Sequence, residues 1–278
     1  MIDQQEIINL LLSAIVTSVD AGAKIMEVYN SNDFQVNLKS DRTPLTLADK
    51  VAHEVIKESL SKTYIPVLSE EGRNILFEER KNWEYFWIVD PLDGTKEFIK
   101  RNGEFTVNIA LLQNGYPILG VIYVPVTNEL YYSLEGRGAY KEPGISNVNI
   151  KDFKAENLFR QETKLPQSIS RKEVVVVESR SHTSTETYEY IEMLSKKVGD
   201  IKTIPCGSSL KMCMIAEGNA DIYPRLSLSS EWDTAAGQAI VEGAGFQVIS
   251  YETNERIRYN KEELLNPWFI VRNQHRVN

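Results

Sequence analysis

The sequence is poor in the residues that build thiolate and imidazole metal sites, and it has no excess of positive charge. It contains two cysteines, Cys206 and Cys213, and three histidines. The two cysteines do not form a zinc-binding pattern and are typical of buried thiols in a reducing compartment. The formal net charge is −8, which argues against a polymeric nucleic acid as partner because such proteins carry a basic face.

Long hydrophobic runs are also missing. No uninterrupted apolar run reaches the roughly 18 residues that would suggest a bilayer span, so the sequence predicts no transmembrane segment. The chain begins Met1-Ile2-Asp3, whereas a secretory signal begins with basic residues and then turns apolar. These absences predict a cytoplasmic protein.

The hydrophobic periodicity of the first half predicts an α+β arrangement. A helix is expected over residues 5–29, and a second from Thr46, where Thr46 and Asp49 resemble a capping box. Short apolar runs and an Asn114-Gly115 turn predict buried strands and hairpins. The expected strands cover 65–68, 85–89, 107–112, 118–123, 130–132 and 139–140.

The second half alternates strands with helices. We place the boundary in the polar, weakly periodic segment 141–172, which divides the chain into 1–145 and 146–278. Gly218 and Gly243 are expected to end two of the helices. Strands are expected over 174–177, 201–204 and 221–223, and helices over 185–198, 208–217 and 233–242. The whole pattern predicts a layered sandwich with an α+β first half and an α/β second half.

Acidic side chains follow two of the predicted buried strands. Glu70 and Glu71 end one strand, and Asp90 and Asp93 end another. Carboxylates at strand ends converge at one edge of a sheet, and together they repel unless a cation neutralises them. Oxygen ligands alone favour a hard cation such as Mg²⁺ over zinc.

The 90–95 motif adds a phosphate-binding feature. Pro91 fixes a bend, and Gly94 lets backbone N–H groups approach a ligand at the start of a predicted helix. An Asp-Gly turn alone is usually turn chemistry, and a Glu-Glu pair is usually a solvated face. On the residues alone, a magnesium–phosphate site and this simpler interpretation remain equally open.

The spacing of these motifs and of Trp232-Asp233 resembles the signature of the lithium-sensitive, magnesium-dependent phosphatases. That superfamily includes inositol monophosphatase, fructose-1,6-bisphosphatase and the 3′(2′),5′-bisphosphate nucleotidases. The resemblance covers about residues 40–240 and implies a sugar-phosphatase-like α-β-α-β-α sandwich. Within the superfamily, Glu97 favours the CysQ-type nucleotidases over the inositol monophosphatases, which usually have Asn there. The other segments typical of that branch are 90–110, 179–182, 207–211, 223–225 and 232–237.

The resemblance implies a metal site. Glu70, Asp90 and the Leu92 carbonyl would hold a first Mg²⁺. Asp90, Asp93 and Asp233 would hold a second, and a third, weaker ion near Glu70 is left open. Asp49 and Thr95 would orient and deprotonate the attacking water, which is chemically reasonable for a hydroxyl backed by a carboxylate.

The resemblance also implies a substrate site. Gly94 and Thr95 would bind the scissile phosphate, and Lys211 and Arg225 the 5′-phosphate, with Ser208 adding a hydroxyl at a helix start. His182 would lie against the adenine or ribose. The complete substrate-binding set would be Glu70, Leu92, Asp93, Gly94, Thr95, His182, Ser208, Lys211, Arg225 and Asp233.

The expected reaction is hydrolysis of adenosine 3′,5′-bisphosphate to AMP and phosphate, with action on 3′-phosphoadenylyl sulfate and a place in sulfate assimilation also implied. An inositol or sugar monophosphatase with the same metal site stays open, as does a non-catalytic sensor of the bisphosphate. The partner would be a small molecule. Monomer and homodimer, and a peripheral location on the cytoplasmic face of the inner membrane, are left open.

Overall fold

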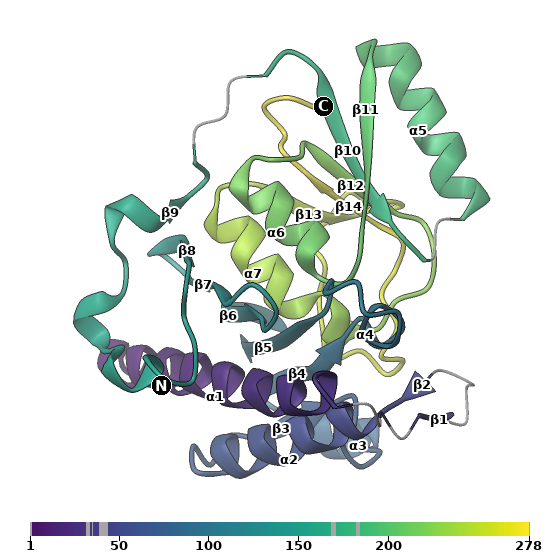
Figure 1. The fold of residues 1–278 in the computed structure, drawn as a ribbon. Coiled ribbons are helices and arrows are strands. Elements are labelled where there is room, and N and C mark those ends of the chain that lie inside the picture. The colour runs from purple at the N-terminus through teal and green to yellow at the C-terminus, as the bar shows by residue number, and fades with distance from the viewer. Residues whose placement is uncertain are drawn as a thin grey trace.

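The computed structural model describes residues 2–31, 34, 36–38, 44–167, 171–181 and 184–277. Helices and sheets alternate in five layers (Figure 1): two helices, a seven-stranded sheet, two helices, a five-stranded sheet and one helix. Such layers form because each sheet and helix must cover its apolar faces. The predicted α-β-α-β-α sandwich is confirmed.

The first half builds the seven-stranded sheet, in which the strands follow one another in chain order. The pairing of β3 with β4 is parallel and the other pairings are antiparallel. The central strands are buried along nearly their whole length, which explains their continuous apolar runs. The strands are β3 (Val67–Ser69), β4 (Tyr85–Asp93), β5 (Thr106–Gln113), β6 (Tyr116–Val124), β7 (Glu129–Leu134), β8 (Gly138–Glu142) and β9 (Lys164–Leu165).

Two helices cover the outer face of this sheet, α1 (Gln4–Tyr29) and α2 (Leu47–Ser61). The predicted capping box of α2 is confirmed: the Thr46 side chain accepts from Ala48 N at 3.2 Å, and Asp49 Oδ2 accepts from Thr46 N at 2.7 Å. A short helix, α3 (Phe77–Arg80), follows β3, and β1 (Asn37–Leu38) pairs with β2 (Pro44–Leu45) before α2.

Helix α1 bears on the prediction that the chain has no transmembrane segment. Among the described residues it is the one helix long and apolar enough, by length and composition, to cross a membrane. Half of its most apolar window is buried inside the protein, where the helix contacts α2 and β6. These contacts account for its apolar residues as part of the core.

The second half builds the five-stranded sheet, in the order β11-β10-β12-β14-β13. The predicted strands are present as β10 (Val174–Ser179), β11 (Ile201–Cys206) and β12 (Ile222–Arg225), which pair in parallel. The sequence analysis missed β13 (Gln247–Ser250) and β14 (Phe269–Arg272). Strand β14 lies between β12 and β13 and is antiparallel to both, so the end of the chain completes this sheet.

Helices α6 (Leu210–Glu217) and α7 (Ala235–Gly243) lie between the two sheets, and α5 (Thr185–Val198) covers the outer face of the second (Figure 1). Both inner helices begin two residues later than predicted. Gly218 ends α6 at φ +82°, as predicted, whereas Gly243 is the last residue of α7 and its cap is Ala244. A positive φ occurs at Gly245, two residues after the last residue of α7.

The division of the chain near residue 145 stays a prediction, and the structure adds two relevant observations. The 141–172 segment contains η1 (Ile150–Asp152), η2 (Ala155–Asn157) and η3 (Gln161–Thr163), and its strand β9 joins the first sheet. Lys141 Nζ lies 2.6 Å from both Glu129 and Glu217, which links β8 to α6. The halves therefore share a core rather than a thin contact.

Candidate active site

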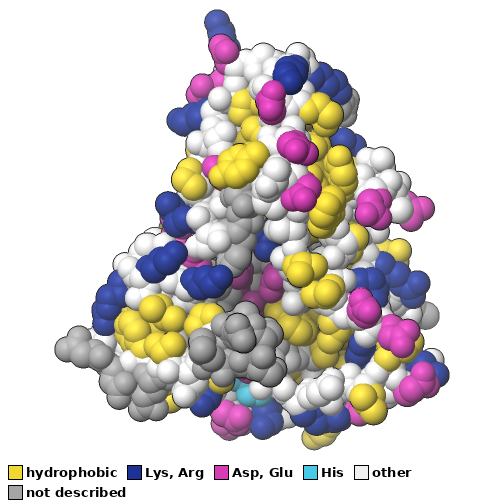
Figure 2. Space-filling model, turned by 90° about the vertical axis from the view of Figure 1, so that its right-hand side faces the viewer, with side chains coloured by type: hydrophobic (Ala, Val, Ile, Leu, Met, Phe, Trp, Pro, Cys, Tyr) yellow, Lys and Arg dark blue, Asp and Glu magenta, His cyan; other side chains and the backbone are white. Residues whose placement is uncertain are grey.

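A cleft of about 200 Å³ lies where the two halves meet. Figure 2 shows acidic side chains in the depth of a hollow on this face of the molecule. Among the described residues, the charged residues predicted for the site line the cleft, except Asp49. Lys96 and Glu97, which had no role in the predicted site, line it too. Its charged lining comprises the acidic Glu70, Asp90, Asp93, Glu97 and Asp233 and the cationic Lys96, Lys211 and Arg225.

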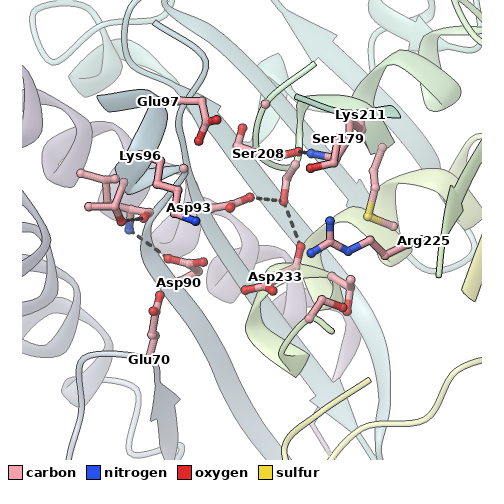
Figure 3. A pocket seen from close by; sticks show the side chains of 18 of the residues that line it. Glu70, Asp90, Asp93, Lys96, Glu97, Ser179, Ser208, Lys211, Arg225 and Asp233 are labelled. Atoms are coloured by element: carbon pink, nitrogen blue, oxygen red, sulfur yellow. Dashed lines mark hydrogen bonds between the residues drawn. The ribbon is translucent and has the colours of Figure 1, made fainter. Parts of the chain in front are cut away.

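The carboxyl ends of β3 and β4 meet at this cleft, as the sequence predicted. Glu70 N donates to Val89 O at 3.1 Å, which continues the parallel β3–β4 pairing to the residue just before Asp90. Strand β4 then passes through the 90–95 motif with an irregularity between Asp90 and Asp93. This irregularity lets Leu92 N donate to Asp90 Oδ1 at 3.1 Å. Asp90 and Asp93 therefore both line the cleft (Figure 3).

The electrostatics of these carboxyl groups show that they are crowded together. Burial raises the pKa of Asp90 well above its usual value, and the carboxylates of Glu70 and Asp93 raise it further. Burial also raises the pKa of Asp93, while Lys211 and the Ser209 hydroxyl act in the opposite direction. The pKa of Asp233 is raised to about 7, first by burial and then by Asp93 and Glu70. Buried like charges of this kind call for a cation.

A second carboxylate arrangement links α2 to the motif. Asp49 is buried, and its Oδ2 accepts from the Thr46 hydroxyl at 2.6 Å in addition to the Thr46 N–H. Its other oxygen, Oδ1, accepts from Thr95 Oγ1 at 3.2 Å. The same hydroxyl lies 3.4 Å from Leu92 O. The structure thus brings Asp49 and Thr95 together, although they are far apart in sequence.

The motif ends in the helix α4 (Thr95–Ile99), as predicted. Gly94 stands before it with φ +96°, a conformation that favours glycine. An added Cβ would lie 2.9 Å from Glu104 O and 3.2 Å from Ser208 Cβ. Glycine is therefore required twice here, for the backbone angle and for the close approach of Ser208 from the second half.

The second half contributes Asp233 from the short turn η4 (Glu231–Asp233). Asp233 Oδ2 accepts from Ser230 N at 2.8 Å, so the carboxylate caps its own turn. Ser209 connects this turn to the motif, because its hydroxyl lies 2.8 Å from Asp93 Oδ2 and 3.0 Å from Asp233 O. Asn108 Nδ2 donates to the same hydroxyl at 2.9 Å.

The cationic residues of the second half lie in the cleft with partial internal partners. Lys211 is buried, and its Nζ donates to Ser208 O and, at 3.4 Å, to Cys206 O. Arg225 Nη2 donates to Leu228 O at 2.7 Å, while its buried Nε has no hydrogen-bond partner among the described residues. Figure 3 shows Arg225 beside Asp233.

One predicted position needs correction, and one lies outside the structure's range. Ser208 is not at the start of a helix: it has φ +46°, Ser209 caps α6, and the helix begins at Leu210. The dipole argument for Ser208 is therefore wrong, although the residue does line the cleft. His182 lies outside the described residues.

Sequence reasoning gave no role to Ser209, Asn108 or Glu97, which the structure brings to or beside the site. Ser209 was inside a motif that had been noted, but its neighbour Ser208 was chosen. Asn108 follows the motif in the next strand, and pairing of β5 with β4 places it opposite Asp90. A prediction of that register could have found it.

The donor chemistry of the cleft fits a hard divalent cation. Carboxylate and carbonyl oxygens line a common space. Burial raises the pKa of Asp90, Asp93 and Asp233, and neighbouring carboxylates raise those of Asp90 and Asp233 further, a repulsion that a cation would remove. In the positions shown, however, no three His, Cys, Asp or Glu side chains of the described residues already enclose a point that could hold a metal ion.

Comparison with known proteins defines the class. The model of the inositol monophosphatase family matches residues 3–276, so the chain belongs to that family. A solved complex of an inositol monophosphatase/NADP phosphatase with Mg²⁺ and phosphate shares the fold, with 19% identity and a TM-score of 0.71. That match covers 97% of this chain and 91% of the other.

Within the family, two CysQ proteins are much more similar to this chain in sequence. The 3′(2′),5′-bisphosphate nucleotidase CysQ of Salmonella typhimurium is 44% identical over 256 residues, which cover 91% of this chain and 95% of the relative. The crystal structure of CysQ from Bacteroides thetaiotaomicron is 49% identical, with a TM-score of 0.88 and coverage of 95% and 97%. The predicted resemblance to the CysQ-type branch is confirmed.

Proposed function

We propose that this protein hydrolyses the 3′-phosphate of adenosine 3′,5′-bisphosphate to give AMP and phosphate. The observation that supports this most strongly is the 44% identity to a 3′(2′),5′-bisphosphate nucleotidase over nearly the whole of both chains. The acidic cleft with Lys211 and Arg225 beside it supports the same reaction, because a bisphosphate needs both a metal site and a second anion site.

The residues that would hold Mg²⁺ are the carboxylates of the cleft and one backbone carbonyl. Glu70, Asp90 and Leu92 O would hold a first ion, and Asp90, Asp93 and Asp233 a second. When bound, two such ions lower the pKa of water and stabilise the leaving oxygen of a phosphate ester. We propose two ions; a third near Glu70 would be weaker.

Asp49 and Thr95 would handle the proton of the attacking water. A water that donates to Thr95 Oγ1 is oriented by a hydroxyl that itself donates to Asp49 Oδ1 at 3.2 Å. As the water oxygen forms its bond to phosphorus, Thr95 accepts the water proton and passes its own to Asp49. The bond from phosphorus to the ribose 3′-oxygen breaks, and that oxygen leaves with a proton taken from solvent.

The N–H groups of Gly94 and Thr95 would bind the scissile phosphate, and the cations of the second half would bind the 5′-phosphate. Arg225 has an unpartnered buried Nε at the cleft, so it can donate to an anion without losing an existing bond of that nitrogen. Lys211 would need to share its ammonium between the ligand and its two carbonyl partners. Ser208 and His182 are proposed as further contacts to the nucleotide.

The alternatives have less support. In an inositol or sugar monophosphatase the same metal site would be used, but Arg225 and Lys211 would have no second phosphate to bind. In a sensor, the Asp49–Thr95 pair would have no function. Action on 3′-phosphoadenylyl sulfate, a role in sulfate assimilation and inhibition by Li⁺ are further parts of the proposal. We propose a cytoplasmic location.

The test is phosphate release from adenosine 3′,5′-bisphosphate with Mg²⁺, with and without Li⁺, beside inositol 1-phosphate. We expect fast nucleotide turnover that Li⁺ suppresses. Preference for inositol 1-phosphate would contradict the roles of Lys211 and Arg225, and binding without release would indicate a sensor. Arg225→Ala should raise the KM for the bisphosphate about tenfold while leaving the KM for adenosine 3′-phosphate, which lacks the 5′-phosphate, unchanged.

A further inference from the structure

Glu97 is a buried carboxylate of the cleft that the mechanism above does not use. It is 5% exposed, lies in the first turn of α4 and lines the same cleft as Asp93 and Arg225. Figure 3 shows it on a different side of the cleft from Arg225. A negative charge placed beside sites for two phosphates weakens substrate binding unless it contacts a hydrogen-bond donor of the ligand.

A hydroxyl, rather than a cation in direct contact, holds the carboxylate of Glu97 in place. Ser181 Oγ donates to Glu97 Oε1 at 2.6 Å, and no described cation forms an ion pair with it. By contrast, the neighbouring Glu104 is paired with Arg180 and also accepts from Gly207 N at 2.7 Å. Both carboxylate side chains pack against Gly207, where an added Cβ would lie 2.8 Å from Glu97 Cγ and 2.9 Å from Glu104 Cβ.

The position of Glu97 on α4 is close in the chain to the proposed site of the scissile phosphate. Gly94 and Thr95, which would bind the scissile phosphate, are in the same helical turn as Glu97. The substrate group nearest to the scissile ester that can donate a hydrogen bond is the vicinal ribose hydroxyl. An ionised carboxylate can only accept, so a hydroxyl suits it and a further phosphate does not.

We propose that Glu97 is a specificity-determining residue that accepts a hydrogen bond from the ribose hydroxyl vicinal to the scissile phosphate. This inference rests on the proposed nucleotidase activity and adds a substrate contact to it. It predicts that the enzyme discriminates against nucleotides that lack this hydroxyl, because their binding would leave the buried carboxylate with one hydrogen bond fewer.

The experiment compares kcat/KM for adenosine 3′,5′-bisphosphate, its 2′-deoxy analogue and the inosine analogue, which lacks the 6-amino group. We expect the unaltered protein to prefer the ribonucleotide over the deoxynucleotide by about tenfold. In Glu97→Ala this ratio should fall close to one, and Glu97→Gln, which keeps an oxygen acceptor, should give an intermediate ratio. Each ratio is measured on one preparation, so a partly unfolded variant does not alter it.

Glu104→Gln is the matched control, because it alters the other carboxylate packed on Gly207. It should retain the tenfold ratio, since Glu104 does not line the cleft. Equal ratios in the unaltered protein and Glu97→Ala would overturn the proposal. So would a Glu97→Ala effect confined to the adenosine-to-inosine ratio, which would place Glu97 at the base. Failure of the unaltered protein to hydrolyse any of the three would overturn the nucleotidase proposal itself, with this one.

Discussion

The two halves contribute to the candidate site in different ways. The first half presents Asp90, Asp93 and Gly94 from one continuous stretch, where β4 passes into α4. The second half presents Asp233 from a turn held by contacts from distant segments. Glu231, buried in that turn, accepts from Asn260 N at 2.7 Å and Lys261 N at 3.1 Å. The chemistry of the first region is thus set by local sequence, and that of the second by tertiary contacts.

This difference predicts which substitutions should affect the reaction rate and which should affect metal binding. Substitutions in the continuous motif remove chemistry directly and should have large effects on rate with small effects on folding. Substitutions in the supports of the second region should alter how well Asp233 is placed, and therefore metal binding, by smaller factors. The largest effect is expected in the continuous motif.

Asp93→Asn should lower kcat/KM for adenosine 3′,5′-bisphosphate by about 10³-fold, since the carboxylate is proposed to hold a metal ion. Without metal, the thermal midpoint should not fall, because the substitution removes one of several buried, mutually repelling carboxyl groups. Phosphate release and a melting curve in chelator measure the two effects. The exposed Asp200→Asn is the control, and a rate unchanged by Asp93→Asn would exclude Asp93 from the reaction.

Gly94→Ala should lower activity by about 10²-fold and destabilise the fold by about 2–3 kcal/mol. The reasons are its φ of +96° and the backbone oxygen 2.9 Å from the added Cβ. Gly136→Ala is the matched control: its φ is +76°, but no atom lies within 4 Å of an added Cβ. It should cost about 1 kcal/mol and leave the rate unchanged. Equal activity losses in the two variants would show that the close contacts of a Cβ at position 94 do not affect activity.

The residues of the first region were the ones that the sequence could identify. Apolar runs located β3 and β4, and the position of Glu70, Asp90 and Asp93 directly after such runs brought the carboxylates to one sheet edge. The Thr46–Asp49 capping box was also readable, because all of its contacts are local. Within the 90–95 motif and the capping box, residues that are close along the chain are also close in space.

The second region was harder to predict because its contacts are long in sequence. Ser209 contacts Asp93, which is 116 residues away in the sequence, and Asn266 donates to Thr234 Oγ1, 32 residues away. No local sequence pattern predicts either contact. Strand β14 is four residues long and is defined by its pairing with β12 and β13 rather than by a local pattern. The start of α7 was placed too early because Asp233, an expected helix residue, instead caps its own turn.

Asn266→Ala should raise the Mg²⁺ concentration needed for half-maximal activity by about tenfold, and high Mg²⁺ should restore most of the rate. Asn266 Nδ2 donates to Ser230 O at 2.6 Å and to Thr234 Oγ1 at 3.0 Å, which fixes both sides of the turn that carries Asp233. Asn149→Ala is the control, because Asn149 bridges a loop by similar bonds away from the cleft. A loss of stability without a change in Mg²⁺ dependence would reduce Asn266 to a structural role.

The smallest expected effect is a pH dependence of stability in the metal-free protein. The folded-state pKa of Asp233 is raised to about 7, above its ordinary value of 3.8, so between these values the folded protein binds a proton that the unfolded chain does not. Stability from this group is therefore present below pH 4 and is lost as pH rises through 7. His53 acts in the opposite direction, because burial lowers its pKa. The comparison must therefore be made against Asp233→Asn.

We compare the melting temperatures of the unaltered protein and Asp233→Asn in chelator. As pH rises from 5.5 to 8, the first minus the second should decrease by about 2–4 °C for each kcal/mol of stability lost. Added Mg²⁺ should raise the midpoint of the unaltered protein more at pH 8 than at pH 5.5, because the ion competes with protons for the same carboxylates. The Asn variant should show little of that pH dependence. If the Mg²⁺ effect does not depend on pH, Asp233 is already ionised in the metal-free fold. Repulsion between carboxylates would then act less on Asp233 than on Asp90 and Asp93.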